Sequence, residues 1–236
     1  MMSTEPETLK GISSMATQHL LAQLADQYVH EHPVRVQIES VGGVKAEKRV
    51  LEDEPFDFVI LASGAMERLA AAGKIDRDSL VGVVSSSIAV ATRLGLAAPD
   101  VHSEDSIRDA VRNARTVGYS TGPSGQYILR LLEKWGIPTG SDARQPQMVE
   151  ARPGVPVGSL VASGEVDIGF QQISELIDVE GINLLGLLPD PIQKTTVFSA
   201  AIASSSHRQE ATRAFLRFLV SPATEPAKKA HGMSAA

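Results

Sequence analysis

The stretch VGYSTGPSGQY, Val117–Tyr127, predicts a strand that turns abruptly into a helix. A β-prone run, Thr116–Tyr119, leads into the turn, and a periodic apolar segment, Tyr127–Trp135, follows it. Gly122 and Gly125 allow the backbone to come close to a bound group. The first N–H groups of a helix have no partner inside the helix and lie at the positive end of its dipole. Such a turn therefore suits a carboxylate or another oxyanion.

Ser120, Thr121 and Ser124 add hydroxyl groups at the start of this helix. The same residue types are typical of an ordinary N-cap that bonds only to its own helix, and one turn alone leaves this alternative open. Three further junctions between a strand and a helix are also rich in Ser and Gly: Ser13-Ser14, Ser40 to Gly43, and Ser63-Gly64. The recurrence favours an anion site built from several turns.

Strand and helix patterns alternate along the whole chain. The predicted strands are Thr8–Ser13, Val34–Val41, Phe56–Ala62, Leu80–Thr92, Thr116–Tyr119, Met148–Ala151, Val166–Phe170, Ile182–Leu188 and Thr195–Ala203. The predicted helices are Met15–His30, one from Val44, Ala65–Ala72, Ser103–Asn113, Tyr127–Trp135, Val157–Ser163, His207–Val220 and a weaker one after Pro222, while Gly140–Gln147 is polar and irregular. This alternation indicates an α/β fold with largely parallel sheets, whose ligands bind at the carboxyl ends of the strands.

Composition excludes several classes of function. The chain has 236 residues, enough for one large domain or two lobes, and a formal net charge of −6, which argues against general binding of nucleic acid. It contains no cysteine, so there is no thiolate metal site and no cysteine nucleophile. The sequence has no P-loop, no GxSxG motif and no His/Asp/Glu cluster with metal-ligand spacing. We therefore expect no cofactor and no metal.

The first residues, MMSTEPETLKGISS, lack the basic start and apolar core of a secretory signal. No run of eighteen apolar residues occurs in the chain, so we expect no insertion into a membrane. The sequence as given predicts a cytoplasmic protein, or a periplasmic one if a leader has been removed.

Five segments resemble the type II periplasmic binding proteins, in particular their molybdate-binding-protein-like group. They are the strand ending in Ser13-Ser14, EPFDFVILAS at Glu54–Ser63, PSGQY at Pro123–Tyr127, SGEVDIGF at Ser163–Phe170 and FLRFLVSP at Phe215–Pro222. The resemblance covers nearly the whole chain. It implies two α/β lobes, residues 1–88 plus 196–236 and residues 89–195, each a mostly parallel sheet flanked by helices, with the ligand in a cleft.

The resemblance also implies a set of ligand contacts near the helix starts. Carried over to this chain, and extended to neighbouring groups able to donate to an oxygen, they are Ser13, Ser14, Ser40, Gly43, Ser124, Gly125, Gln126, Gln172 and the turn near Gly154. Gln172 stands where the molybdate binders often have a tyrosine, which argues against molybdate as the ligand. The segments GFQQISEL and GLLPDPIQKTTVFSAAI are similar to a subgroup that includes aconitate isomerase, an activity that moves a double bond in an unsaturated tricarboxylate.

Arg152, in EARPGVP, is the best-placed cation for a carboxylate, because a guanidinium can donate two parallel hydrogen bonds. Lys45 is the second choice, and a solvated surface charge is the alternative for both. For proton transfer the candidates are Tyr127, His19 and Glu175. Their alternatives are a packed aromatic, an exposed helix residue and a helix-cap partner, respectively.

Two hypotheses from different classes result. The first is a cofactor-independent isomerase of a small unsaturated di- or tricarboxylate. The second is a solute-binding protein that captures an oxyanion or carboxylate for an ABC transporter. The absence of a signal sequence favours the first, and the majority of the resembled family favours the second.

Overall fold

The computed structural model describes residues 7–140 and 146–236. The chain divides into two compact units, of which unit 1 comprises the residues up to Ser85 together with Val197–Ala236, and unit 2 comprises Ser86–Thr196. Strands β4 (Val81–Arg93) and β9 (Thr195–Ile202) each contain one of the two boundaries. The sequence prediction placed these boundaries after residues 88 and 195.

Unit 1 is built on a mixed sheet. Strand β1 (Glu7–Ser14) pairs in parallel with β2 (Val34–Val41) on one side and with β3 (Phe58–Ala62) on the other. Strand β9 then pairs antiparallel with β3, and the short β10 (Ser234–Ala235) pairs antiparallel with β4. The parallel part of the sheet is thus the part whose strands lead into helices.

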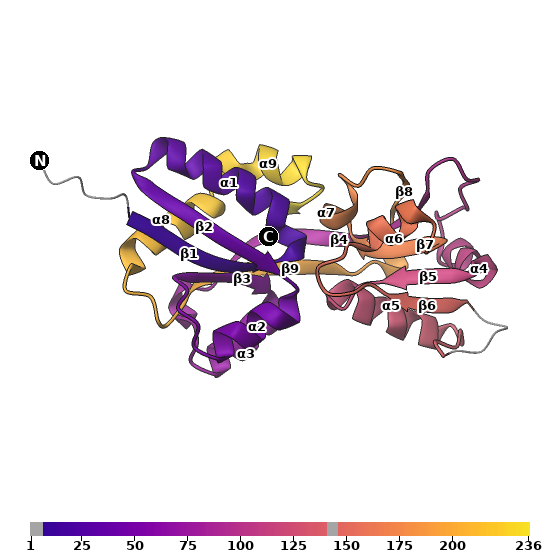
Figure 1. Ribbon diagram of the computed structural model, residues 1–236, viewed down its shortest axis with the longest axis horizontal. Helices are drawn as coiled ribbons and strands as arrows, with labels where there is room; N and C mark the ends of the chain where they lie inside the picture. The colour runs from indigo at the N-terminus through magenta and orange to yellow at the C-terminus, as the bar shows by residue number, and fades with distance from the viewer. Residues whose placement is uncertain (1–6, 141–145) are drawn as a thin grey trace, which may run out of the picture. The chain divides into compact units, whose positions relative to one another are not determined.

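Helices cover both faces of this sheet (Figure 1). The helical segments of unit 1 are η1 (Met15–Thr17), α1 (Gln18–Glu31), α2 (Gly43–Leu51), α3 (Ser63–Ala71), η2 (Arg77–Ser79), α8 (Gln209–Leu219), η4 (Pro222–Thr224) and α9 (Glu225–Ala230). Successive residues of β3 point to opposite faces, so Phe58 and Ile60 pack with α1 and α8, whereas Val59 and Leu61 pack with α2 and α3. A strand buried on both faces explains the continuous apolar run in the sequence.

Unit 2 repeats the parallel arrangement with different partners. Strand β5 (Thr116–Tyr119) pairs in parallel with β6 (Gln147–Glu150) and with β7 (Ile168–Gln172). Strand β4 pairs antiparallel with β7 and with β8 (Ile182–Leu187). The helical segments are α4 (Glu104–Asn113), α5 (Pro123–Lys134), α6 (Val157–Ser163), α7 (Ile173–Leu176) and η3 (Asp190–Ile192).

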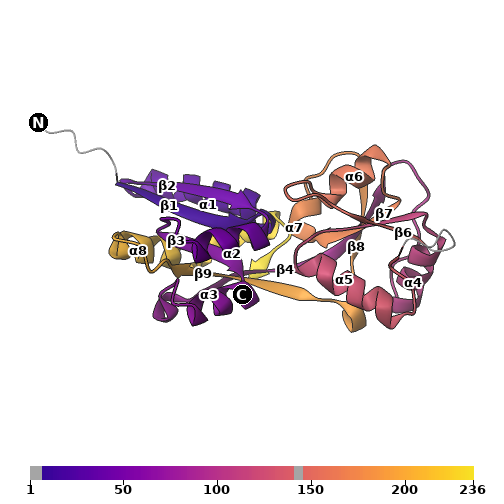
Figure 2. The same ribbon diagram turned by 60° about the horizontal axis from the view of Figure 1, so that its bottom comes forward.

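Helices again lie on both faces of the sheet in unit 2 (Figure 2), and the buried apolar side chains pack beneath them. Helices α4 and α5 bury their apolar side chains on one face, and α6 and α7 bury theirs on the other. Helix α4 begins at a capping box formed by Ser103 and Ser106. Gly164 ends α6 with φ of +82°, a left-handed conformation that glycine adopts without strain.

The structure corrects several sequence expectations. The helix expected at Met15–His30 begins with a 3₁₀ turn, and residue Gln147, expected in an irregular stretch, begins β6. Residues 1–6 and 141–145, which carry parts of the signal and loop expectations, lie outside the described residues.

Within the described ranges, no helix is long and apolar enough to span a bilayer. The same residues contain no group of three or more His, Cys, Asp or Glu placed to hold a metal ion.

An aromatic cluster joins the helices of unit 1 to its sheet. Phe215 of α8 is 0% exposed, and the centroid of its ring lies 5.1 Å from that of Tyr28 on α1 and 5.1 Å from that of Phe58 on β3. Aromatic pairs at such separations bury a large apolar area. The side chain of Phe215 therefore packs α8 against both α1 and β3.

We expect Phe215→Ala to lower the free energy of unfolding by about 3–5 kcal/mol, because it removes buried area and leaves a cavity between α1, α8 and β3. Leu51→Ala is the control, since Leu51 is 41% exposed on α2. Urea unfolding of both variants followed by circular dichroism measures the difference. Equal, small losses in the two variants would contradict the assigned role of Phe215.

Candidate functional site

In unit 1 the carboxyl ends of β1, β2 and β3 meet at one edge of the sheet. The register pairs Ser13 with Ser40, and the two hydroxyl oxygens lie 2.7 Å apart. Ser13 is 0% exposed, so this hydrogen bond ties β1 to β2 inside the sheet. Of the two predicted contacts, Ser40 keeps part of its surface exposed, whereas Ser13 is buried and bonds to Ser40.

Ser14 differs from its neighbour. It is only 7% exposed, and its Oγ has no hydrogen-bond partner among the described residues. Gly43 begins α2 close by, since a Cβ added there would lie 3.9 Å from the Cβ of Ser14. The N-cap of α2, Gly42, supplies no side-chain cap. A buried hydroxyl without a partner costs free energy, and a ligand oxygen beside the uncapped start of α2 would satisfy it.

The other candidates in unit 1 contribute less to this edge. The hydroxyl of Ser63, at the start of α3, lies 2.8 Å from that of Ser199 and donates to the carbonyl of Val197, so it is already engaged. His19 on α1 and Lys45 on α2 are exposed. The exposed-residue alternative for His19 and the surface-charge alternative for Lys45 agree with these positions.

In unit 2 the turn between β5 and α5 has the tight geometry that its sequence predicts. The hydroxyls of Ser120 and Ser124 lie 3.1 Å apart, and Ser124 is 2% exposed. A Cβ added at Gly125 would lie 1.7 Å from the carbonyl oxygen of Ser120, so only glycine fits this close approach. The N-cap, Gly122, provides no side-chain cap, so no side chain at that position occupies the first N–H groups of α5. Gln126, also on α5, is exposed.

Arg152 follows the carboxyl end of β6 by two residues and is exposed. No acidic side chain in the described part of the chain forms an ion pair with its guanidinium. Gly154, in the same turn, has φ of +85°. The turn thus presents a cation at the same edge of the sheet as the start of α5, because β5 and β6 are parallel.

The carboxyl end of β7 carries two buried amides. Gln172 is 1% exposed, its Nε2 donates to Thr196 Oγ1 at 2.9 Å, and its Oε1 has no partner among the described residues. Gln171 Oε1 accepts a hydrogen bond from the backbone N–H of Val157 at 2.8 Å, and Gln171 Nε2 donates to Glu175 Oε1 at 2.8 Å. Burial raises the pKa of Glu175 to about 7, against the smaller opposing effect of the hydrogen bond from Gln171.

The expectation that Glu175 caps a helix is wrong. The start of α7 has no side-chain cap, and the carboxyl group instead accepts from the amide four residues earlier. Gln171 lies in β7 and Glu175 in α7, so the pair spans a junction between a strand and a helix, and no helical spacing in the sequence could have indicated it.

Tyr127 lies on α5 and packs against the core of unit 2. Its hydroxyl donates to the carbonyl of Ile192 at 2.9 Å, and burial raises its pKa. These contacts match the packed-aromatic alternative. A role of Tyr127 in proton transfer stays a prediction.

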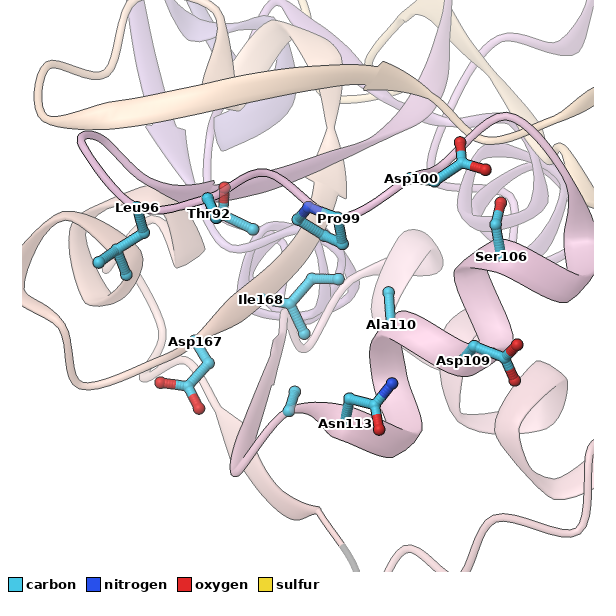
Figure 3. A pocket seen from close by; sticks show the side chains of 12 residues that line it. Thr92, Leu96, Pro99, Asp100, Ser106, Asp109, Ala110, Asn113, Asp167 and Ile168 are labelled. Atoms are coloured by element: carbon cyan, nitrogen blue, oxygen red, sulfur yellow. The ribbon is translucent and has the colours of Figure 1, made fainter.

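Unit 2 also has a hollow of about 480 Å³ at the opposite ends of its strands (Figure 3). Asp167, which immediately precedes β7, lines it together with Asp100 and Asp109. The guanidinium of Arg115 bonds to Asp167 and lowers its pKa, so this carboxylate stays ionised. An acidic lining repels a carboxylate ligand, and the anion-binding features lie at the other end of the sheet.

Comparisons with known proteins agree with this architecture. The family model of bacterial extracellular solute-binding proteins matches residues 9–234. An aconitate isomerase of Pseudomonas sp. is 35% identical over 219 residues, which are 91% of this chain and 82% of that protein.

Solved structures extend the similarity of fold. The periplasmic molybdate-binding protein of Azotobacter vinelandii matches with a TM-score of 0.76 at 20% identity, covering 97% of this chain and 99% of that one. The substrate-binding domain of a putative molybdenum ABC transporter from Clostridium difficile matches with a TM-score of 0.72 at 15% identity and the same coverage. These neighbours are two-lobed type II periplasmic binding proteins, as the resemblance in the sequence implied. The chain belongs to the family of bacterial extracellular solute-binding proteins.

Proposed function

We propose that this protein is a cofactor-independent isomerase that shifts a double bond in a small unsaturated di- or tricarboxylate, as an aconitate isomerase does. The observation that carries the proposal is the similarity to an aconitate isomerase over most of both chains. The groups at the sheet edges support it, because they suit an anionic substrate and include a carboxyl group with a pKa near neutrality.

Substrate binding is assigned to the groups at the carboxyl ends of the parallel strands. Ser14 and Gln172 each have a buried polar atom that has no partner in the described chain, and Arg152 offers two parallel donors. Ser40, Gly43, Ser124, Gly125 and Gln126 complete the proposed set through hydroxyls, a side-chain amide and backbone N–H groups. Ser13, which is fully buried, belongs to the set as the residue that positions the hydroxyl of Ser40. The ligand is a carboxylate, and neither nucleic acid nor a membrane takes part.

The alternative is a binding protein without turnover that delivers a carboxylate or an oxyanion to an ABC transporter. The family match favours this alternative, and so do several similar structures, which include a periplasmic molybdate-binding protein, a tungstate-binding protein and a tungstate ABC transporter. Both functions use the same edges of the sheets. They differ in whether a carbon-bound proton moves.

We expect the purified protein to convert cis-aconitate to the trans isomer, or to exchange its methylene protons, in deuterated buffer. Proton NMR followed over an hour detects either change, with a sample lacking protein as the control. The proposal predicts conversion that scales with protein concentration. An unchanged spectrum together with tight binding of molybdate in calorimetry would instead establish the binding-only alternative.

We expect Arg152→Ala to weaken binding of aconitate by about 1.5–3 kcal/mol, the range for a hydrogen bond to a charged group, which is roughly ten- to hundredfold in Kd. Arg130→Ala is the matched control, because Arg130 is exposed on α5 of the same unit. Isothermal titration calorimetry measures both. An unchanged Kd in Arg152→Ala would remove Arg152 from the proposed contacts.

A further inference from the structure

Helix α7 places a carboxyl group directly beyond the carboxyl end of β7. Glu175 follows Gln172, the last residue of that strand, by three positions. Strand β7 is parallel to β5, with Phe170 opposite Tyr119, so both strands end at the same edge. Glu175 therefore belongs to the edge where α5 begins and where Arg152 follows β6. Glu175 is half-buried at this edge.

The hydrogen bond to Glu175 has only one possible direction. The backbone N–H of Val157 must donate, so the atom of Gln171 that receives it is Oε1 and the remaining atom is Nε2. Nε2 in turn donates to Glu175 Oε1. Because Oε1 is engaged by this amide, Oε2 is the better placed oxygen for the proton of the neutral carboxyl group. The pair thus leaves one defined oxygen atom to take up and release a proton.

No cation offsets this carboxyl group in the elements packed against α7. Helix α6 and strand β7 contain no titratable residue. Strand β4, which packs through Ala89 and Ala91, has only Arg93, and the guanidinium of Arg93 lies against Gly164 at the far end of α6. The remaining acidic groups nearby in sequence, Asp178 and Glu180, are exposed beyond α7. Burial without a counter-charge accounts for a pKa of about 7.

We propose that Glu175 is the general base and acid of the allylic isomerisation, with Gln171 as the residue that positions it. Ionised Oε2 takes a proton from the methylene carbon of the substrate. The electron pair of that C–H bond forms the new double bond to the adjacent carbon. The old double bond opens, and its other carbon takes the proton back from Oε2. Glu175 ends ionised again, and no oxidant or reductant is needed. This inference rests on the proposed function.

A base that cycles in this way works best with a pKa near the working pH, where it is both ionised and able to return the proton. Glu175 meets this condition and lies at the edge where β5 and β7 end. Neither of the other two candidates combines such a pKa with such a position. The hydroxyl of Tyr127 is bonded to the carbonyl of Ile192, and His19 is an exposed residue of α1 in unit 1.

The variant that separates catalysis from structure is Glu175→Gln. Its amide oxygen can still accept from Gln171, so the link to Val157 and the start of α6 is kept while the base is lost. We expect turnover of cis-aconitate to fall by about 100-fold or more, the usual contribution of a general base, with Kd changed by less than about threefold. Glu180→Gln, an exposed glutamate of the same unit, should keep wild-type turnover.

The pH profile tests the positioning role. We expect kcat/KM to rise with pH through an apparent pKa near 7 as Glu175 ionises. Gln171→Leu removes the hydrogen bond that favours the ionised carboxylate, so the rising limb should move to higher pH. A limb that stays in place in Gln171→Leu would overturn the positioning role of Gln171.

The outcomes distinguish the proposed function from the catalytic role of Glu175. A wild-type protein that neither converts nor exchanges aconitate overturns the proposed function and the catalytic assignment with it. An active wild type together with a Glu175→Gln variant within tenfold of its turnover overturns only the assignment.

Stability supplies a test that needs no substrate. Folding raises the pKa of this carboxyl group. Its contribution to stability is therefore fully present at pH values below the pKa in the unfolded state, and it is lost as pH rises through the folded-state pKa of about 7. Glutamine does not titrate. The melting temperature of Glu175→Gln minus that of the wild type should therefore increase between pH 5 and pH 8 and stay constant above pH 8. The same difference for Glu180→Gln should not change with pH. A constant difference at all pH values would overturn the assignment of a raised pKa to Glu175.

Discussion

Parallel pairing is the constraint on which the candidate site depends. Strand β1 lies between β2 and β3, and β5 lies between β6 and β7, in parallel in each case. Parallel neighbours cannot be joined by a tight turn, so the chain must leave each strand through a longer connection, usually a helix. Strand ends and helix starts therefore gather at one edge within each unit. Every group assigned to ligand binding lies in or just after such a junction.

The polar atoms at these edges fall into two kinds. Some are satisfied within the protein, such as the hydroxyls of Ser13 and Ser40, which bond to each other, and the amide of Gln171, which bonds at both ends. Others, the hydroxyl of Ser14 and the carbonyl oxygen of Gln172, are buried without a partner in the described chain. A buried polar atom left unpaired lowers stability, so a ligand oxygen or donor that bonded to the atoms of this second kind would recover part of that free energy.

The role proposed for Glu175 would add a chemical step to a fold that binds anions. Binding of an anion requires hydrogen-bond donors and cations. An ionised carboxylate in the same place would repel the anion, whereas a protonated carboxyl group would not. Burial without a counter-charge brings its pKa to about 7, which allows both protonation states near neutral pH. The same architecture serves transport proteins and an isomerase among its relatives, so function resides in a few placed groups rather than in the fold.

The sequence by itself determined the order and type of the elements, because hydrophobic periodicity and turn residues are local properties: Val34–Val41, Thr116–Tyr119 and Val157–Ser163 were predicted with the bounds that the structure has. It also pointed to the family through its motifs. Only the tertiary structure decided which polar atoms are already paired. Whether Ser63 is engaged by Ser199, or Glu175 by Gln171 rather than by a helix start, depends on neighbours and burial that no local pattern contains.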